Sequence, residues 1–221
     1  MSVVPRPELI EGDDGVVRCA WGALDPEYRR YHDEEWGTPQ HDPVRLFEKV
    51  CLEGFQAGLS WITILRRRPA FREVFHGFDA EAVAAMTEVD VERLLGDARI
   101  IRHRGKIEAT IQNARATLAL DAPLDEFLWS FAPPARDSAP RSFAEVPATT
   151  PESFAMSKAL RKLGFRFVGP TTMYALMQAV GMVDDHLAGC FRGRAHTEVG
   201  AAEAAPLGAN PIATPTAAAS A

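Results

Sequence analysis

The 221-residue sequence has few cysteines, no long apolar run and no excess of basic residues. Three cysteines are an odd number, so we do not expect a disulfide framework, and metal binding or burial explains them better. The absence of an apolar run of about 18 residues excludes a membrane-spanning helix. The first residues also lack an apolar segment after a basic start. We therefore expect no secretory signal and a protein that stays in the cytosol.

The charge balance differs from that of a generic nucleic-acid-binding protein, which is usually basic. The chain has 24 Lys and Arg against 30 Asp and Glu, a net charge of −6. The acidic excess lies at the ends, with a net −3 in residues 1–15 and −2 in residues 195–221, so residues 16–194 are near −1. A nearly neutral body can still present one basic face, so the charge does not exclude DNA binding.

Composition divides the chain into a body and two tails. Residues 1–15 are polar with two prolines and are expected to be a flexible tail. Residues 195–221 are rich in Ala, Pro and Thr, and such a segment buries too little apolar surface to offset the entropy of ordering, so we expect disorder there. The body, residues 16–194, shows almost no strand-like alternation. We therefore predict an all-α domain.

Local start signals predict where the helices of the body begin. A capping residue followed by proline, or a capping residue before a run of apolar residues at helical spacing, marks a helix start. A helix near residue 60 should continue through WITILRRR, and residues 104–120 form the longest candidate. The predicted starts are Asp42-Pro43, Ser60, the caps Asp79 and Asp90, residue 104, and Thr150-Pro151.

The segment SKALRKLGFRFVGPTTMYALMQAVGM, residues 157–182, predicts two helices joined by a tight turn. The first helix should end at Gly164, and the second should start at Pro170 with Thr171 or Thr172. Backbone N–H groups of such a turn and of the next helix N-terminus can bind a DNA phosphate. Basic residues crowd the same place: Lys158, Arg161, Lys162 and Arg166. The alternative is an ordinary helical hairpin with surface charge.

A second basic cluster precedes and opens the long helix: Arg99, Arg102, His103, Arg104 and Lys106. By itself this cluster fits a solvated face better than a DNA contact.

Two cysteines and two histidines have the composition of a zinc site. Cys190 lies four residues after His186, a spacing that shares one face of a helix, and Cys19 and His32 form a Cys-x12-His pair. A closed Cys2His2 set suits structural rather than catalytic zinc. It would attach the N-terminal segment to the last helix. The alternative is that these four are ordinary buried residues, as we expect for Cys51.

A carboxylate, Glu53, lies in the sequence among aromatic residues and small or apolar neighbours. The aromatic residues are Tyr28, Tyr31, Trp36 and Trp61. A flipped purine needs stacking surfaces and hydrogen-bond partners, and a cationic base is attracted both to aromatic faces and to a carboxylate. The alternative is an aromatic core with Glu53 near a helix end. A buried Glu is costly without a partner, however, and a ligand is one possible partner.

Four long motifs resemble the 3-methyladenine DNA glycosylase I family, within the helix-hairpin-helix superfamily. They are RCAWGALDPEYRRYHDEEWG, LFEKVCLEGFQAGLSWITILRRR, DARIIRHRGKI and LRKLGFRFVGPTTMYALMQAVGMVDDH. The resemblance, which ends with a trailing AGC, covers about residues 17–191, and the two tails lie outside it.

The resemblance implies a helix-hairpin-helix glycosylase with Zn²⁺ as a structural cofactor. It implies that Glu53 hydrogen-bonds the base, that Tyr28, Tyr31, Trp36 and Trp61 form the pocket walls, and that Cys19, His32, His186 and Cys190 bind the zinc. Leu59, which follows Gly58, corresponds to the residue that fills the gap in the duplex. For contacts with DNA we add the hairpin residues Gly164, Phe165, Gly169 and Thr171. The expected partner is double-stranded DNA with alkylated adenine, the product is free 3-methyladenine, and the protein is expected to be a monomer.

The implied reaction is hydrolysis of the N-glycosidic bond of 3-methyladenine, which leaves an abasic site. We expect Asp185 to orient His186 rather than to act in catalysis. Lys106, Lys158 and Lys162 are expected to be phosphate or surface groups, so the enzyme would be monofunctional. Two other classes remain: a zinc-stabilised protein that binds alkylated DNA without cleaving it, and a hydrolase in which zinc activates water.

Overall fold

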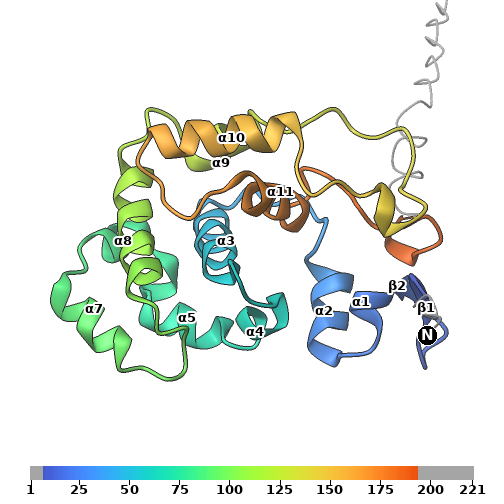
Figure 1. Ribbon diagram of the computed structural model, residues 1–221, viewed down its shortest axis with the longest axis horizontal. Helices are drawn as coiled ribbons and strands as arrows, with labels where there is room; N and C mark the ends of the chain where they lie inside the picture. Colours follow the sequence, from blue (N-terminus) through green and yellow to red (C-terminus); the bar gives the residue numbers. More distant parts are fainter. Residues whose placement is uncertain (1–6, 194–221) are drawn as a thin grey trace, which may run out of the picture.

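The computed structural model describes residues 7–193, which form a mainly helical protein with one small sheet (Figure 1). The elements are β1 (Leu9–Glu11), β2 (Val17–Cys19), α1 (Ala20–Ala23), α2 (Pro26–Glu34), α3 (Pro43–Gln56), α4 (Trp61–Leu65), α5 (Arg68–Val74), η1 (His76–Phe78), α6 (Ala80–Ala84), α7 (Glu88–Leu95), α8 (Arg104–Leu118), α9 (Leu124–Trp129), η2 (Phe143–Glu145), α10 (Pro151–Lys162) and α11 (Pro170–Ala179). Within these residues no helix is long and apolar enough to cross a membrane.

The sheet corrects two expectations, an entirely α-helical domain and a flexible tail over residues 1–15. Strands β1 and β2 pair antiparallel with Leu9 opposite Cys19. The buried Arg18 holds this hairpin in place, because its guanidinium pairs with Asp14 and with Asp33 of α2, both at 2.8 Å. One acidic residue of the expected tail, Asp14, thus has a buried partner. Residues 1–6 and the predicted disordered segment 195–221 lie outside the described residues.

Most predicted helix starts are confirmed by the caps. Asp42 Oδ1 accepts a hydrogen bond from the Arg45 amide at 2.9 Å at the start of α3, and Asp79 caps α6. Asp90 is not a cap: Thr87 caps α7, and the Asp90 carboxylate at the third position accepts from the Thr87 amide.

The helix predicted to run from Ser60 through WITILRRR ends early, as α4 at Leu65, and a separate helix, α5, begins at Arg68. Pro69 explains the break, since proline fits the first turn of a new helix but not the interior of a continuing one.

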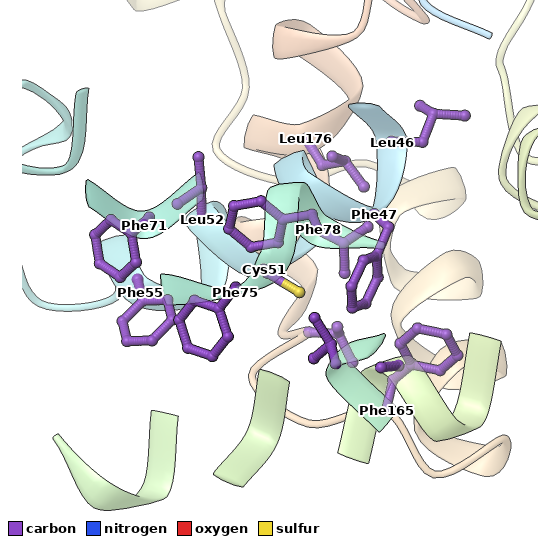
Figure 2. Close-up of a cluster of buried hydrophobic side chains, with 14 of the residues drawn as sticks. Leu46, Phe47, Cys51, Leu52, Phe55, Phe71, Phe75, Phe78, Phe165 and Leu176 are labelled. Atoms are coloured by element: carbon purple, nitrogen blue, oxygen red, sulfur yellow. The ribbon is translucent and has the colours of Figure 1, made fainter. Parts of the chain in front are cut away.

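Helix α3 runs through the centre of the molecule and supports the rest of the fold. It contacts α4, α8, α9, α11 and η1. Figure 2 shows its apolar side against a cluster of phenylalanine rings, in which the Phe55 and Phe71 centroids are 4.6 Å apart. Cys51 lies in the same core, as predicted. Because α3 is packed on so many sides, a polar side chain on it is held in a defined position.

The predicted helical hairpin corresponds to α10 and α11. Gly164 has a φ of +90° and ends the first helix, and Gly169 caps the second, which starts at Pro170. The turn between them is held by side chains from its surroundings. Asn113 of α8 both donates to the Arg166 carbonyl and accepts from the Arg166 amide, so the turn is attached to α8.

Candidate active site and metal centre

A cavity of about 170 Å³ lies between α1, α2, α3, α4 and α11. The structure brings together there all five residues that the sequence assigned to the base pocket. The lining residues are Trp21, Tyr28, Tyr31, Trp36, Glu53, Gln56, Trp61, Ala175, Gln178 and Ala179. Helices that are distant in the sequence therefore combine to form one aromatic cavity with a carboxylate in its wall.

The aromatic walls support one another edge to face. The Trp21 ring lies 5.6 Å from the ring of Tyr28 and 5.0 Å from that of Trp36, both at steep angles. The Tyr28 hydroxyl accepts a hydrogen bond from the Ile62 amide at 3.0 Å. This bond ties α2 to the first turn of α4, the helix that carries Trp61. The walls are thus held in place before any ligand arrives.

Glu53 is 4% exposed and belongs to the buried part of α3. Burial raises the pKa of its carboxyl group to about 7, and the positive charge of Lys49 opposes that rise. Lys49 precedes Glu53 by four residues and thus shares its helix face. The cavity therefore contains a carboxylate whose charge is poorly solvated, and a cationic ligand would stabilise that charge.

Five lining residues were missing from the sequence prediction: Trp21, Gln56, Ala175, Gln178 and Ala179. Trp21 carried a usable signal, because it lies in the same aromatic-rich stretch as Tyr28. The α11 residues are spaced i, i+3 and i+4 and form a small, polar face on an otherwise apolar helix. That pattern predicts that the three side chains share one side of the helix, but not which part of the protein that side contacts.

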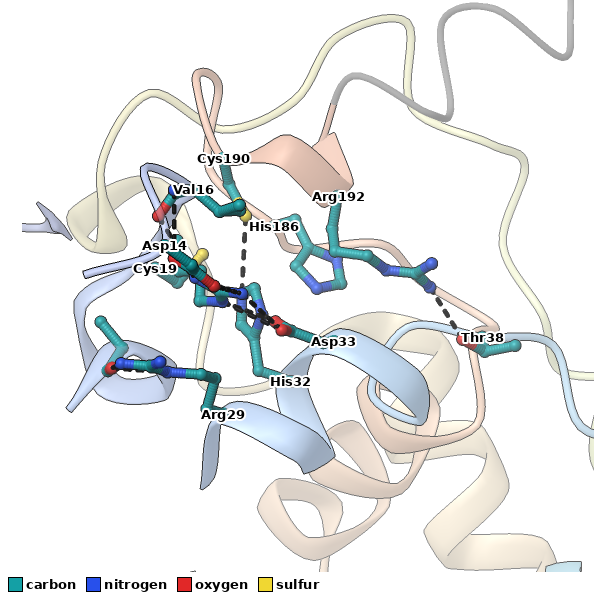
Figure 3. Close-up of polar contacts among 12 residues, drawn as sticks. Asp14, Val16, Cys19, Arg29, His32, Asp33, Thr38, His186, Cys190 and Arg192 are labelled. Carbon is teal, nitrogen blue, oxygen red and sulfur yellow. Dashed lines mark hydrogen bonds and ion pairs between the residues drawn. The ribbon is translucent and has the colours of Figure 1, made fainter. Parts of the chain in front are cut away.

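Three of the four predicted metal ligands form one buried group. The ligand atoms of Cys19, His32 and Cys190 all lie within 4.8 Å of one another. His32 Nε2 is 3.4 Å from the Cys190 sulfur (Figure 3). The neighbouring Cys19 and His32 hold the pKa of the Cys190 thiol far below its ordinary value. A stabilised thiolate is what a metal ion requires of a cysteine ligand.

The fourth predicted ligand, His186, lies beside this group. Its ring centroid is 4.9 Å from that of His32, and its buried Nε2 has no hydrogen-bond partner among residues 7–193. The orphaned nitrogen fits a metal ligand, since a buried imidazole nitrogen otherwise finds a partner. His186 and Cys190 were predicted to share one face of a helix. In the structure both lie instead in the loop after α11.

The residue that orients His186 is Asp184, and the prediction of Asp185 in this role is wrong. Asp184 Oδ1 lies 2.6 Å from His186 Nδ1. Asp185 points to α11 instead, where it accepts hydrogen bonds from Tyr174 and Gln178 and pairs with Arg136 at 2.8 Å. The segment is not helical, and successive side chains of such a chain point to different sides.

Two other predicted roles are also corrected. Lys106 is buried, and its amino group donates to the carbonyl oxygens of Phe55 at 2.9 Å and Ala57 at 2.6 Å. It therefore satisfies the carbonyl end of α3 rather than a phosphate. Phe165 is only 3% exposed, and its amide donates to the Leu160 carbonyl, so neither group is available to DNA.

The remaining predicted DNA-contacting residues lie at or near the surface. Leu59 is 41% exposed and follows Gly58, whose φ of +81° forms a sharp turn. Thr171 is exposed in the first turn of α11, next to the partly exposed Gly169 and across the turn from Gly164.

The second basic cluster is largely neutralised, as expected for a solvated face. Arg99 pairs with Glu73 and Asp97, and Arg104 pairs with Glu88 and Glu92.

Comparisons with known proteins point to one family. A family model described as methyladenine glycosylase matches residues 21–193. The chain is 53% identical over 181 residues to DNA-3-methyladenine glycosylase 1 of Escherichia coli K12, covering 79% of this chain and 96% of that protein. It is 48% identical to DNA-3-methyladenine glycosylase of Haemophilus influenzae, covering 79% and 97%.

Solved structures give the same result. A crystal structure of 3-methyladenine DNA glycosylase I superposes with a TM-score of 0.76 at 53% identity and covers 79% of this chain and 98% of that one. A second structure, concerned with 3-methyladenine recognition by the Staphylococcus aureus enzyme, has a TM-score of 0.76 at 36% identity and covers 80% and 96%. The chain belongs to the methyladenine glycosylase family.

Proposed function

We propose that this protein is a DNA glycosylase that hydrolyses the N-glycosidic bond of 3-methyladenine in double-stranded DNA. The products are free 3-methyladenine and an abasic site. The observation that supports this most directly is the buried Glu53 carboxylate in the wall of an aromatic cavity. The names of the E. coli and H. influenzae relatives agree with this activity.

The size of the cavity favours a single extruded base. A cavity of about 150 Å³ can hold benzene, and this one measures about 170 Å³ and is partly open to solvent. A base pair would not fit. The target nucleotide must therefore leave the stack before the reaction, as for other enzymes that act on bases. Exposed Leu59, at the sharp turn after Gly58, would fill the gap that the base leaves.

The chemistry follows from the charge of the substrate. Methylation at N3 makes the attached base cationic, and the base leaves as a neutral molecule, so protonation of the leaving group is not required. Glu53 accepts hydrogen bonds from the amino edge of the base and stabilises the positive charge of the transition state. The aromatic rings stack on the electron-poor base. No lysine acts as a nucleophile in this scheme, so the enzyme is monofunctional.

The hairpin of α10 and α11 is the proposed contact with the DNA backbone. Gly164 and Gly169 let the chain approach a phosphate closely, and Thr171 is exposed in the first turn of α11. The helix N-terminus attracts the phosphate through its free N–H groups. These contacts position the enzyme on DNA without reading sequence. We infer from them that the pair of helices is a helix-hairpin-helix motif.

We also propose that Cys19, His32, His186 and Cys190 hold one structural zinc ion. Asp33 contacts Nδ1 of His32 at 2.8 Å, and Asp184 contacts Nδ1 of His186 at 2.6 Å. The Nε2 atoms of both histidines therefore remain available to bind the ion. When bound, the ion would link β2 and α2 to the loop after α11. Four protein ligands leave no open position, so the ion would not activate water.

Measurement of base release from methylated duplex DNA, resolved by chromatography, tests the proposed function. We expect release of 3-methyladenine with 7-methylguanine left in the DNA. Glu53→Gln keeps the shape of the side chain but removes its charge, and Glu53→Ala removes both. By comparison with other electrostatic groups in active sites, we expect each to reduce the rate about 100-fold.

The exposed Glu126 of α9 gives a matched control, and Glu126→Gln should leave the rate unchanged. Absence of any released base with folded, zinc-loaded wild-type protein would instead favour a protein that binds alkylated DNA without cleaving it.

A further inference from the structure

Lys49 is a buried lysine next to the proposed base pocket. It is 8% exposed on α3. Its amino group is 3.4 Å from the Tyr31 hydroxyl and 3.7 Å from Glu35 Oε2. It also lies over the rings of Tyr31 and Trp61, at 4.5 Å and 5.3 Å from their centroids. A lysine is seldom buried unless it has a task or a strong partner, and this one contacts two walls of the pocket.

Lys49 also lines a second, larger cavity, of about 430 Å³. Its lining is mostly charged and consists of Arg30, Glu34, Glu35, Thr38, Gln40, Arg45, Glu48, Lys49, Arg68, Arg72 and Ala179. Ala179 also lines the aromatic cavity, so the two spaces are neighbours. Lys49 thus lies between a charged region that is open to water and the aromatic cavity that contains Glu53.

The charges around Lys49 come from three elements and are mostly engaged with one another. Glu35, just after α2, receives two hydrogen bonds from Arg68 of α5, each 2.5 Å long. Glu48 of α3 pairs with Arg45 and Arg72. The phenol group of Tyr31 reaches the site from α2.

Glu35 is shared between Arg68 and Lys49, and Glu53, one turn further along α3, is another anionic neighbour of Lys49. A neighbouring opposite charge favours the ionised form of a carboxyl group by about one to three pKa units.

We propose that Lys49 is a positioning residue that keeps Glu53 ionised before the base arrives and holds the Tyr31 ring on which the base stacks. This inference rests on the proposed role of Glu53. Two observations support it. Lys49 and Glu53 lie four residues apart on α3 and share a helix face. The Lys49 amino group is 3.4 Å from the Tyr31 hydroxyl and 4.5 Å from the centroid of the Tyr31 ring. In agreement with this arrangement, burial raises the pKa of Glu53 and the Lys49 charge opposes that rise.

The experiment measures kcat/KM for 3-methyladenine release as a function of pH. The wild type should lose activity as the pH falls through about 7, where Glu53 becomes protonated. Lys49→Met removes the charge, and Lys49→Gln removes the charge but retains a polar contact for Tyr31. Both should move the acidic limb upward by about one pH unit or more, which lowers the rate at pH 7 about fivefold. Lys49→Arg should leave the limb near its original position.

The same lysine substitutions in a Glu53→Gln background separate the alternatives. If Lys49 acts through Glu53, Lys49→Gln should not change the pH profile of that variant. An acidic limb at the wild-type pH in both Lys49→Met and Lys49→Gln would overturn the proposal, as would an equal loss with and without the Glu53 carboxyl group.

Thermal melting identifies a variant that does not fold. If Lys49→Met or Lys49→Gln does not fold, the conclusion rests on the other of these two variants. Wild-type activity of Glu53→Gln itself would be a different failure, because it would refute the proposed role of Glu53 and not only that of Lys49.

Discussion

The contact between Gly54 and Phe167 connects the pocket helix to the hairpin, and one added methyl group tests it. A Cβ atom on Gly54 would lie 3.2 Å from Phe167 Cβ and 3.6 Å from its carbonyl oxygen. Carbon atoms pack best at about 3.5–4.0 Å, so one side must move. Phe167 cannot move easily. Its φ is already +57°, and its neighbour Arg166 is bonded on both sides by Asn113.

The expected size of the effect follows from two opposing contributions. Gly→Ala within a helix usually stabilises a protein by about 1 kcal/mol, and Gly54 is inside α3. Overpacking of a tightly held contact costs about 1–3 kcal/mol. We therefore expect Gly54→Ala to lower the free energy of unfolding by about 1 kcal/mol. For a protein of this size the melting temperature would fall by about 3 °C.

Thermal unfolding followed by circular dichroism measures this change, and base release measures its effect on the site. Ala155→Gly gives the calibration. Ala155 is exposed on α10, so its loss of about 1 kcal/mol reports the intrinsic difference between alanine and glycine in this protein. If Gly54→Ala is instead more stable than the wild type, Phe167 has moved aside. The hairpin is then not rigidly coupled to the helix that carries Glu53, and our reasoning is refuted.

Two further perturbations test the walls and the metal centre. Tyr28→Phe removes the acceptor of the Ile62 amide. We expect the free energy of unfolding to fall by about 1 kcal/mol and free 3-methyladenine to bind more weakly. Unchanged stability would show that α4 is held by other contacts. A chelator, or Cys190→Ser, should reduce the metal content measured by atomic absorption and destabilise the fold, and activity should be lost in parallel. Immediate loss of activity in a protein that keeps its helical circular-dichroism signal would instead indicate a catalytic metal.

The elements that the sequence predicted well are those with local signals. Helix α3 begins at Asp42-Pro43 because the aspartate caps the first turn and the proline suits it, and both effects act over four residues. The hairpin of α10 and α11 follows in the same way from Thr150, Gly164 and Pro170. Such signals remain valid in the folded protein because they do not depend on distant partners.

The features that were missed depend on contacts between distant segments. Strands β1 and β2 have three residues each, too few to show alternation, and they are held by the pairing of Arg18 with Asp33 of α2. Asp184 and Asp185 are adjacent and chemically identical in the sequence, and only the path of the loop decides which one reaches His186.

The candidate site shows the same division. Glu53 and its four predicted aromatic neighbours could be identified because residues 28–61 hold two of the three tyrosines and two of the four tryptophans, and the family resemblance supported them. Lys49 could not be identified from the sequence, because a lysine on a helix is normally exposed. Its burial results from the approach of α2 and of Glu35, which follows α2. A buried charge is therefore a signal that only the structure provides.

The electrostatics of the pocket provide a reason for selectivity. Because the pKa of Glu53 is raised from 4.5 to about 7, ionisation of this group lowers the stability of the free protein as the pH rises through that interval. A bound cationic base would compensate the charge and recover that free energy, whereas neutral adenine would not. The substrate is therefore distinguished from the large excess of undamaged adenine by its charge as well as by its shape. On this argument Glu53→Gln should stabilise the unliganded protein near pH 8 and weaken its preference for methylated DNA. Both effects follow from the loss of the same negative charge.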